Sequence, residues 1–282
     1  RKACDGGRTA IRTYVPPEYM VPFYRPVLWT GHSCQAVEET GTKRIVGMAV
    51  EGDDQCAYRF QLEVFLGRKR ISQPVPAELD YDMWLGPAPY KPYNPHRVHQ
   101  TFRGYWDYDG GGLGDMGQHY IDPVQYILGK DDTSPIKVEV DAPQQHPDAV
   151  GTWRSITHTY DDCCQIVLWG GDFGDPNTPY IAGPKGNVYK NFVCDIPDWE
   201  KKLADFPEPE PQVTDFIECV KTRQPFALNE KNGFRSATIV NMGAVALRLN
   251  RTLNFDPVKL EFIDDEAANR LLDQPMRAPW NI

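Results

Sequence analysis

Residues able to do acid–base chemistry are concentrated in the stretch "GGGLGDMGQHYIDPVQYILGK", residues 110–130. If a helix starts at Asp115, then Asp115, His119, Asp122 and Tyr126 follow one another at three- and four-residue intervals and share one face of it. A histidine that is oriented by a carboxylate can act as a general base toward a substrate hydroxyl. The spacing therefore predicts a helix with one chemically active face.

The spacing leaves other interpretations of this face open. Asp115 also suits a helix N-cap, where a carboxylate meets free backbone N–H groups. His119 also suits a structural histidine, and Asp115, His119 and Asp122 together offer ligands for a metal ion. A phosphate-binding loop is disfavoured, because "GGGLGDMG" has no Lys-Ser/Thr and follows no clear strand of a βαβ unit. The glycines instead indicate close approach of the backbone to a ligand or to aromatics such as Trp106.

The opposite face of the predicted helix is apolar and can anchor the helix to a sheet. We expect this anchor to be made by Met116, Tyr120, Val124, Ile127 and Leu128. Gly129 suits the position just after the last turn, where a left-handed backbone is common. The predicted helix therefore runs from Asp115 to about Gly129.

The rest of the chain predicts strands first and helices late. Apolar alternation with period two predicts strands at 135–141, 153–160 and 164–170. Strands are also expected at 43–50 and 57–67, short strands at 252–256 and 260–263, and a turn into a strand at 179–190. Helices are expected at about 196–205, 212–222, 233–250 and 264–272. Residues 73–100 carry six prolines among aromatic residues, which predicts a packed loop. This order is not a βαβα alternation, and it predicts an α+β fold with a largely antiparallel open sheet and helices packed on one face.

Composition excludes several classes of protein. The net charge of −9 over 282 residues argues against nucleic-acid binding, which needs a concentrated basic face. No apolar run approaches the ~18 residues of a membrane span. The seven cysteines form no CxxC pair, so we interpret them as free thiols. Free thiols favour the cytoplasm, and a periplasmic location stays open.

Several motifs in order resemble the glucose–fructose oxidoreductase / inositol dehydrogenase (Gfo/Idh/MocA) family, and the sugar-acting bacterial members in particular. They are "DYDMWLGPAPYKPYNP", "GGGLGDMGQHYID", "GPKG", "VTDFIECVKTRQ" and "NGFRSATIVNMGAVALRL". The resemblance covers about residues 42–282. It implies the substrate domain of an NAD- or NADP-dependent oxidoreductase that acts on a carbohydrate and forms homo-oligomers through its open sheet.

The resemblance also implies roles for individual residues. Asp115 and His119 match the catalytic pair, with His119 the acid/base for hydride transfer at a secondary alcohol, and Asp122 matches the family's trailing aspartate. The loop that approaches the substrate contributes Arg103, Tyr105, Tyr93, Asn94 and His96. For each of these loop residues, ordinary packing is an equally good interpretation.

The chain departs from the family at its start. It has no GxGxxG after a strand and no Glu-Lys-Pro motif, whose lysine completes the family's catalytic set. Residues 1–41 are too few for a Rossmann domain, so we expect an atypical segment there and one substrate and oligomerisation domain at 42–282. The cofactor-binding domain is then expected to lie outside this chain, which alone would have no redox activity. A carbohydrate-binding or partner subunit, and a lyase or hydrolase acting on 3-keto-glycosides, are the alternatives.

Overall fold

The computed structural model describes residues 72–170, 177–189, 193–205, 207, 213–227 and 229–280, together with the backbone of 10–14, 35–38 and 45–49. The strand predicted at 57–67 lies outside these residues. The strand predicted at 43–50 is β3 (Ile45–Ala49), which pairs antiparallel with β2 (Gln35–Glu38).

Eight strands of the described residues form one open sheet in the order β10-β9-β4-β5-β6-β1-β7-β8. Their bounds are β1 (Ala10–Tyr14), β4 (Lys137–Asp141), β5 (Ser155–Thr159), β6 (Gln165–Trp169), β7 (Ile181–Gly183), β8 (Gly186–Val188), β9 (Leu253–Asp256) and β10 (Glu261–Phe262). All neighbours are antiparallel except β1 and β6, which run parallel. The prediction of a largely antiparallel open sheet is confirmed.

Period-two alternation gives this sheet one buried face. Val138 on β4 lies opposite His158 on β5, which lies opposite Ile166 on β6, and all three are fully buried. The intervening residues, such as Glu139 and Val167, are only partly buried. Burial in alternating positions is the pattern of a sheet with one face packed on a core.

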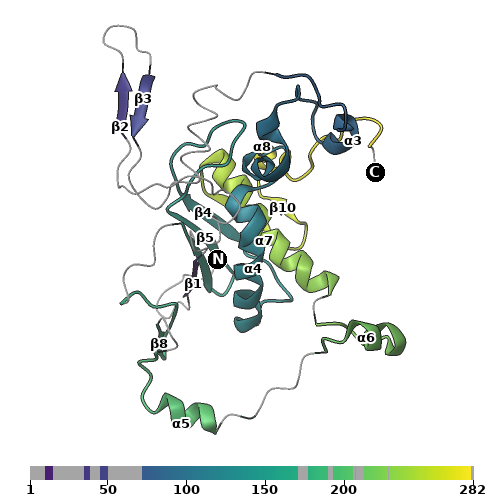
Figure 1. Cartoon of the computed structure of the whole chain (residues 1–282). Helices are drawn as coiled ribbons and strands as arrows, with labels where there is room; N and C mark the ends of the chain where they lie inside the picture. The colour runs from purple at the N-terminus through teal and green to yellow at the C-terminus, as the bar shows by residue number, and fades with distance from the viewer. Residues whose placement is uncertain are drawn as a thin grey trace.

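Two long helices cover the buried face. Figure 1 shows α4 (Gly111–Ile127) and α7 (Glu230–Leu249) side by side over the central strands, and the two helices contact each other extensively. The core side of α7 is strongly apolar and includes Ile239, Met242, Ala246 and Leu247, each exposed by 1% or less. The helix predicted at about 233–250 is thus observed as α7, and the predicted packing of helices on one face of the sheet is observed as well.

The start of α4 differs from the prediction. The helix begins at Gly111, so Asp115 lies inside it and is not its N-cap. Gly111 has a φ of +63°, and the Asp109 carboxylate accepts a hydrogen bond from the Gly110 N–H at 2.6 Å. Glycine has a low intrinsic helix propensity, but at this position it allows the close approach of Gly111 to Val150. Gly129, with a φ of +62°, follows the helix as expected.

The buried stripe of α4 is also rotated relative to the predicted one. Leu113, Ile121 and Val124 are fully buried, whereas Ile127 is 56% exposed. The crossing with α7 explains the rotation, because a Cβ on Gly243 of α7 would lie 3.2 Å from Leu113 Cδ2. A glycine such as Gly243 allows two helices to pack closely, but it does not contribute to a pattern of apolar residues. The apolar pattern therefore predicted the wrong buried face for α4.

The remaining elements are short. The predicted packed loop contains α3 (Tyr81–Leu85), η1 (Pro95–Arg97) and η2 (His99–Gly104), and it buries a small cluster of Tyr81, Leu85, Tyr93 and Val98. Late in the chain come α5 (Trp199–Ala204), α6 (Phe216–Thr222) and α8 (Glu266–Asn269). Among the helices described, none is both long and apolar enough to cross a membrane.

The cysteines are not uniformly free thiols. Cys164, Cys194 and Cys219 are free, but Cys163 is disulfide-bonded, so the free-thiol interpretation is wrong for that residue. Cys163 lies in the turn between β5 and β6 with a φ of +68°. Spacing along the sequence cannot reveal such a pairing, because the two halves of a disulfide meet only in the fold.

Candidate functional site

The first polar centre of α4 is an ion pair. Arg103, near the end of η2, places its Nε 3.2 Å from Asp115 Oδ1, and both side chains are largely shielded from solvent. The guanidinium also lies over the Phe102 ring, 5.0 Å from its centroid. The Asp115 carboxylate is therefore held in place from the preceding loop, one helical turn before His119.

Asp109 completes this centre, and the sequence reasoning missed it. Its Oδ1 occupies the space beside Gly114, where a Cβ would lie only 2.5 Å away. Burial raises the pKa of the Asp109 carboxyl to about 6, the Gly110 N–H opposes that rise, and the Asp115 charge adds to it. The signal in the sequence was an aspartate directly before the glycines, but its burial depends on the fold.

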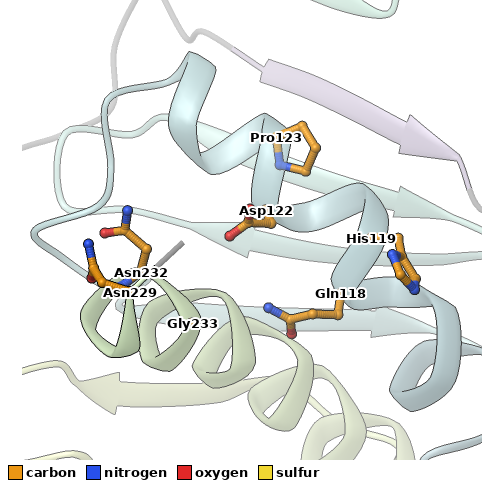
Figure 2. A pocket seen from close by; sticks show the side chains of 7 residues that line it. All are labelled: Gln118, His119, Asp122, Pro123, Asn229, Asn232 and Gly233. Carbon is orange, nitrogen blue, oxygen red and sulfur yellow. The ribbon is translucent and has the colours of Figure 1, made fainter. Parts of the chain in front are cut away.

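The second polar centre is a cleft of about 310 Å³ between α4 and the first turn of α7 (Figure 2). It is lined by Gln118, His119, Asp122, Pro123, Asn229, Asn232 and Gly233. His119 is exposed to solvent here. In Figure 2 the Asp122 carboxylate points toward Asn229 and Asn232, and the His119 ring lies on the far side of the cleft from them.

Hydrogen bonds between the helices fix the walls of this cleft. Ser236 Oγ of α7 lies 2.5 Å from Asp122 Oδ1, and Ser236 is almost fully buried. Asn229 caps α7, because its amide oxygen accepts the N–H groups of Lys231 and Asn232. The Asn232 side-chain N–H₂ donates to the Ala227 carbonyl at 3.1 Å. Asp122 is thus positioned by the helix that forms the opposite wall.

The predicted loop residues lie elsewhere. Asn94 caps η1 by accepting the His96 N–H at 2.9 Å, and His96 Nδ1 lies 2.8 Å from the Tyr105 hydroxyl. Tyr93 packs edge-on against Tyr81. Tyr93, Asn94, His96 and Tyr105 are buried and do not line the cleft. Contact of these four residues with a substrate stays a prediction. Of the other predicted site residues, His119 and Asp122 both line the cleft, and Arg103 forms an ion pair with Asp115.

Among the residues that the structure describes, no group of three His, Cys, Asp or Glu side chains could hold a metal ion. Asp115 is engaged by Arg103, and Asp122 by Ser236. The helix face that spacing offered as a possible ligand set is therefore divided between two separate centres.

The described residues do not fit a dinucleotide cofactor. A dinucleotide site needs a glycine-rich turn between a strand and a helix of a parallel βαβ unit. Here η2 and a turn precede the glycines, and a Cβ on Gly111 would lie 2.9 Å from Val150. The space beside these glycines is filled by protein, so we derive no catalytic step through a cofactor held by them.

The described domain is an open, largely antiparallel sheet with two long helices packed on one face. The family model for the oxidoreductase family C-terminal alpha/beta domain (GFO_IDH_MocA_C2) matches residues 46–282. The chain therefore belongs to the Gfo/Idh/MocA family, and the resemblance seen in its motifs is confirmed.

Solved structures with a similar fold are distant. One is yvaA of Bacillus subtilis, described as an oxidoreductase, with 17% identity and a TM-score of 0.34 over 52% of this chain and 53% of that one. Another is the WlbA dehydrogenase of Bordetella pertussis in complex with NADH and UDP-GlcNAcA, with 17% identity and a TM-score of 0.37 over 55% and 48%. The match thus spans about half the length of each solved chain. Curated proteins give no significant match.

Proposed function

We propose that the described domain is the substrate side of an NAD(P)-dependent oxidoreductase that acts on a sugar or sugar derivative, with His119 as its acid/base. The observation that supports this most is the position of His119. It is exposed at a cleft, and the carboxylate one helical turn before it is held by Arg103. An imidazole at an open cleft can reach a bound hydroxyl and accept its proton.

The residues supply the proton-transfer part of alcohol oxidation. Oxidation of a secondary alcohol removes the hydroxyl proton and transfers a hydride from the same carbon. His119 takes the proton, and in the reverse direction it returns the proton to the carbonyl oxygen. No described group accepts the hydride, and we propose that a nicotinamide cofactor bound outside these residues does so.

Replacement of His119 by Asn tests this proposal. In the wild-type assembly that shows turnover with NAD⁺ or NADP⁺ and a panel of monosaccharides, His119→Asn should lower kcat by about 10²- to 10⁴-fold. Ile127→Ala, on the same helix but outside the cleft, is the matched control and should keep full activity. Wild-type-like turnover by His119→Asn would remove His119 from the chemistry.

The same assay separates the two alternatives. Sugar binding without nicotinamide dependence in any assembly favours a carbohydrate-binding or partner subunit. Turnover of a 3-keto-glycoside without added nicotinamide favours a lyase or hydrolase, in which His119 would move a proton at a carbon or a glycosidic oxygen. Robust NAD(P)-dependent turnover by the chain alone would contradict our expectation that the cofactor domain lies outside it.

We also propose that the chain forms a homo-oligomer through the open face of its sheet. The partly buried side of β4, β5 and β6 brings Glu139, Thr157 and Val167 into one row across three strands. A sheet face on which the described residues place no helix can be stabilised by a second copy. Light scattering after size exclusion tests this, since Val167→Asp should yield monomers if the row is the interface. An unchanged mass would place the interface elsewhere.

A further inference from the structure

Asp109 and Gly110 form an aspartate–glycine pair directly before α4, and pairs of this kind are able to cyclise. In that reaction the main-chain nitrogen after the aspartate attacks the side-chain carboxyl carbon and closes a five-membered imide. A glycine at the second position favours the attack, because it has no Cβ to shield its nitrogen and leaves the backbone free to rotate. The sequence at this point therefore supplies both reacting groups.

The structure brings these two groups together. The Gly110 N–H donates a hydrogen bond to Asp109 Oδ1 at 2.6 Å. Since Asp109 Cγ is bonded to that oxygen, it lies within about 4 Å of the Gly110 nitrogen, close to the separation of about 3–3.5 Å at which groups react. Gly114 packs against the same oxygen, because a Cβ on Gly114 would lie 2.5 Å from it. The carboxyl is thus held beside the nitrogen that would attack it.

The protonation state of Asp109 also suits the reaction. A carboxylate resists attack, whereas a neutral carboxyl can lose its hydroxyl as water. Burial raises the pKa of Asp109 to about 6, the Gly110 N–H opposes that rise, the Asp115 charge adds to it, and the Arg103 charge opposes it. At pH 7 this carboxyl is neutral about a hundred times more often than one with the ordinary pKa of 3.8. Asp109 is only partly buried, so water can reach it.

A second pair within the described residues, Asn232 and Gly233, is arranged differently. The Gly233 N–H donates to the Asn229 carbonyl at 3.0 Å within α7. The Asn232 side-chain N–H₂ donates to the Ala227 carbonyl at 3.1 Å. In a flexible chain an asparagine–glycine pair cyclises faster than an aspartate–glycine pair. Here both groups of the asparagine pair are engaged elsewhere, so the fold favours the aspartate pair.

We propose that Asp109 is a site of spontaneous isomerisation to isoaspartate, through a succinimide formed with the Gly110 nitrogen. The N–Cγ bond forms as a Cγ–O bond breaks, and the hydroxyl leaves with the amide proton as water. A second water molecule then opens the imide. Its attack on the main-chain carbonyl carbon of Asp109 breaks the bond from that carbon to nitrogen and gives isoaspartate, whereas attack on Cγ restores aspartate. The modification requires no oxidant, reductant or cofactor, and it does not depend on the proposed function.

The modification would change the start of α4. Isoaspartate adds one methylene to the main chain before Gly110, and the carboxylate beside Gly114 is lost. This turn has little room for a longer chain, because a Cβ on Gly110 would already lie 3.1 Å from Gly114 Cα. Isomerisation would therefore strain the first turn of the helix that carries Asp115 and His119.

Ageing of the full chain tests the proposal. After several weeks at about 37 °C and about pH 6, tryptic digestion separates residues 104–130 from residues 232–235. Electron-transfer fragmentation then locates isoaspartate, and mass reports the deamidation of Asn232. We expect more isoaspartate at Asp109 than modification at Asn232. Equal or greater modification at Asn232, or no isoaspartate at Asp109, overturns the proposal.

The same ageing in guanidinium chloride separates the fold from the local sequence. Unfolding removes both the contact with Gly110 and the raised pKa, while it increases the mobility of the chain. We therefore expect Asp109 to isomerise about tenfold more slowly in the unfolded chain, and Asn232 to become the faster site. An equal or faster reaction of Asp109 in the unfolded chain would show that the fold does not promote it.

Two variants test the reacting groups. Gly110→Ala places a Cβ beside the attacking nitrogen, at a φ of −94° that alanine can adopt, and should reduce isoaspartate at Asp109 about tenfold or more while Asn232 is unaffected. Circular dichroism verifies that this variant folds. Asp109→Asn keeps the contact with Gly110 and loses ammonia in place of water, so it should react severalfold faster than the wild type. Wild-type isomerisation in folded Gly110→Ala, or slower modification in Asp109→Asn, contradicts the mechanism.

Discussion

A histidine lies on each side of the α4–α7 pair, and the two histidines differ in their exposure to solvent. His119 lies on the outer side, exposed at the cleft, with Asp115 and Asp122 on the same helix held by Arg103 and Ser236. His158 lies on the inner side, in β5, fully buried beside Gly243 of α7. Both His158 ring nitrogens lack a hydrogen-bond partner. The structure gives no reason for a polar ring in that position.

The contrast shows how environment separates two residues of one type. Burial lowers the pKa of His158 to about 3, which keeps its ring neutral at ordinary pH. The outer side instead places polar groups where ligands and water reach them. The acid–base chemistry that we propose for this helix pair therefore involves its outer side, and the inner side only bears the energetic cost of an unpaired polar group.

The largest expected effect concerns the inner histidine. The unfolded His158 binds a proton below pH 6.5 and the folded form does not until about pH 3, so folding stability falls as the pH drops between these values. A shift of this size corresponds to about 5 kcal/mol. His158→Leu should abolish that loss and leave stability at pH 7 equal or higher.

Urea unfolding between pH 3.5 and 7.5 measures this effect. The surface variant His99→Asn removes an exposed histidine and should retain the wild-type acid sensitivity. If the free energy of unfolding of His158→Leu falls at low pH as steeply as that of the wild type, the acid sensitivity arises from other groups and not from the buried histidine.

A smaller effect is expected on the outer side, at Arg103. Arg103→Met leaves the Asp115 carboxylate without its cation, so the charge beside His119 is no longer held in one position. We expect kcat to fall about tenfold to thirtyfold with little change in KM, in the assembly used for His119→Asn. Arg103→Lys keeps the charge and should recover part of the loss. An unchanged kcat in Arg103→Met would show that Asp115 is positioned without Arg103.

The sequence predicted much of the framework and less of the site. Alternation in "WRSITHTY" and "CQIVLWG" placed β5 and β6, and it puts His158 on the same face as Ile156, so the burial of His158 follows from the pattern. The absence of a partner for His158 does not, because it depends on residues from other elements. The start of α4 and its buried face were misplaced, since packing of Gly111 and Gly243 carries no apolar signal.

For the candidate site as well, positions within one helix could be predicted from the sequence, and contacts between distant elements could not. His119 and Asp122 follow from spacing within one helix, and the structure brings both to one cleft. Asn232 and Ser236 reach this site from α7, more than a hundred residues later in the chain, and local spacing does not show such contacts. The same limit applies to Asp109, whose perturbed titration arises from burial against Gly114.

The smallest expected effect belongs to Asp109, and its sign is opposite to that of His158. The pKa of Asp109 is raised to about 6, above its ordinary value of 3.8, so the folded state loses stability as the pH rises between those values. Solvent screening of this partly exposed group limits the loss to about 1–2 kcal/mol. Asp109→Asn keeps an oxygen that accepts the Gly110 N–H, and it should remove this dependence.

Unfolding of the double variant His158→Leu/Asp109→Asn sharpens the comparison between the two sides. The two groups titrate in overlapping ranges with opposite signs, so the wild-type profile contains a partial cancellation between about pH 4 and 6. His158→Leu alone should expose the fall with rising pH that Asp109 causes, and the double variant should be nearly flat there. If His158→Leu alone is already flat, Asp109 titrates as an ordinary surface carboxyl. Its contact with Gly114 then has a steric role at the start of α4 and no electrostatic one.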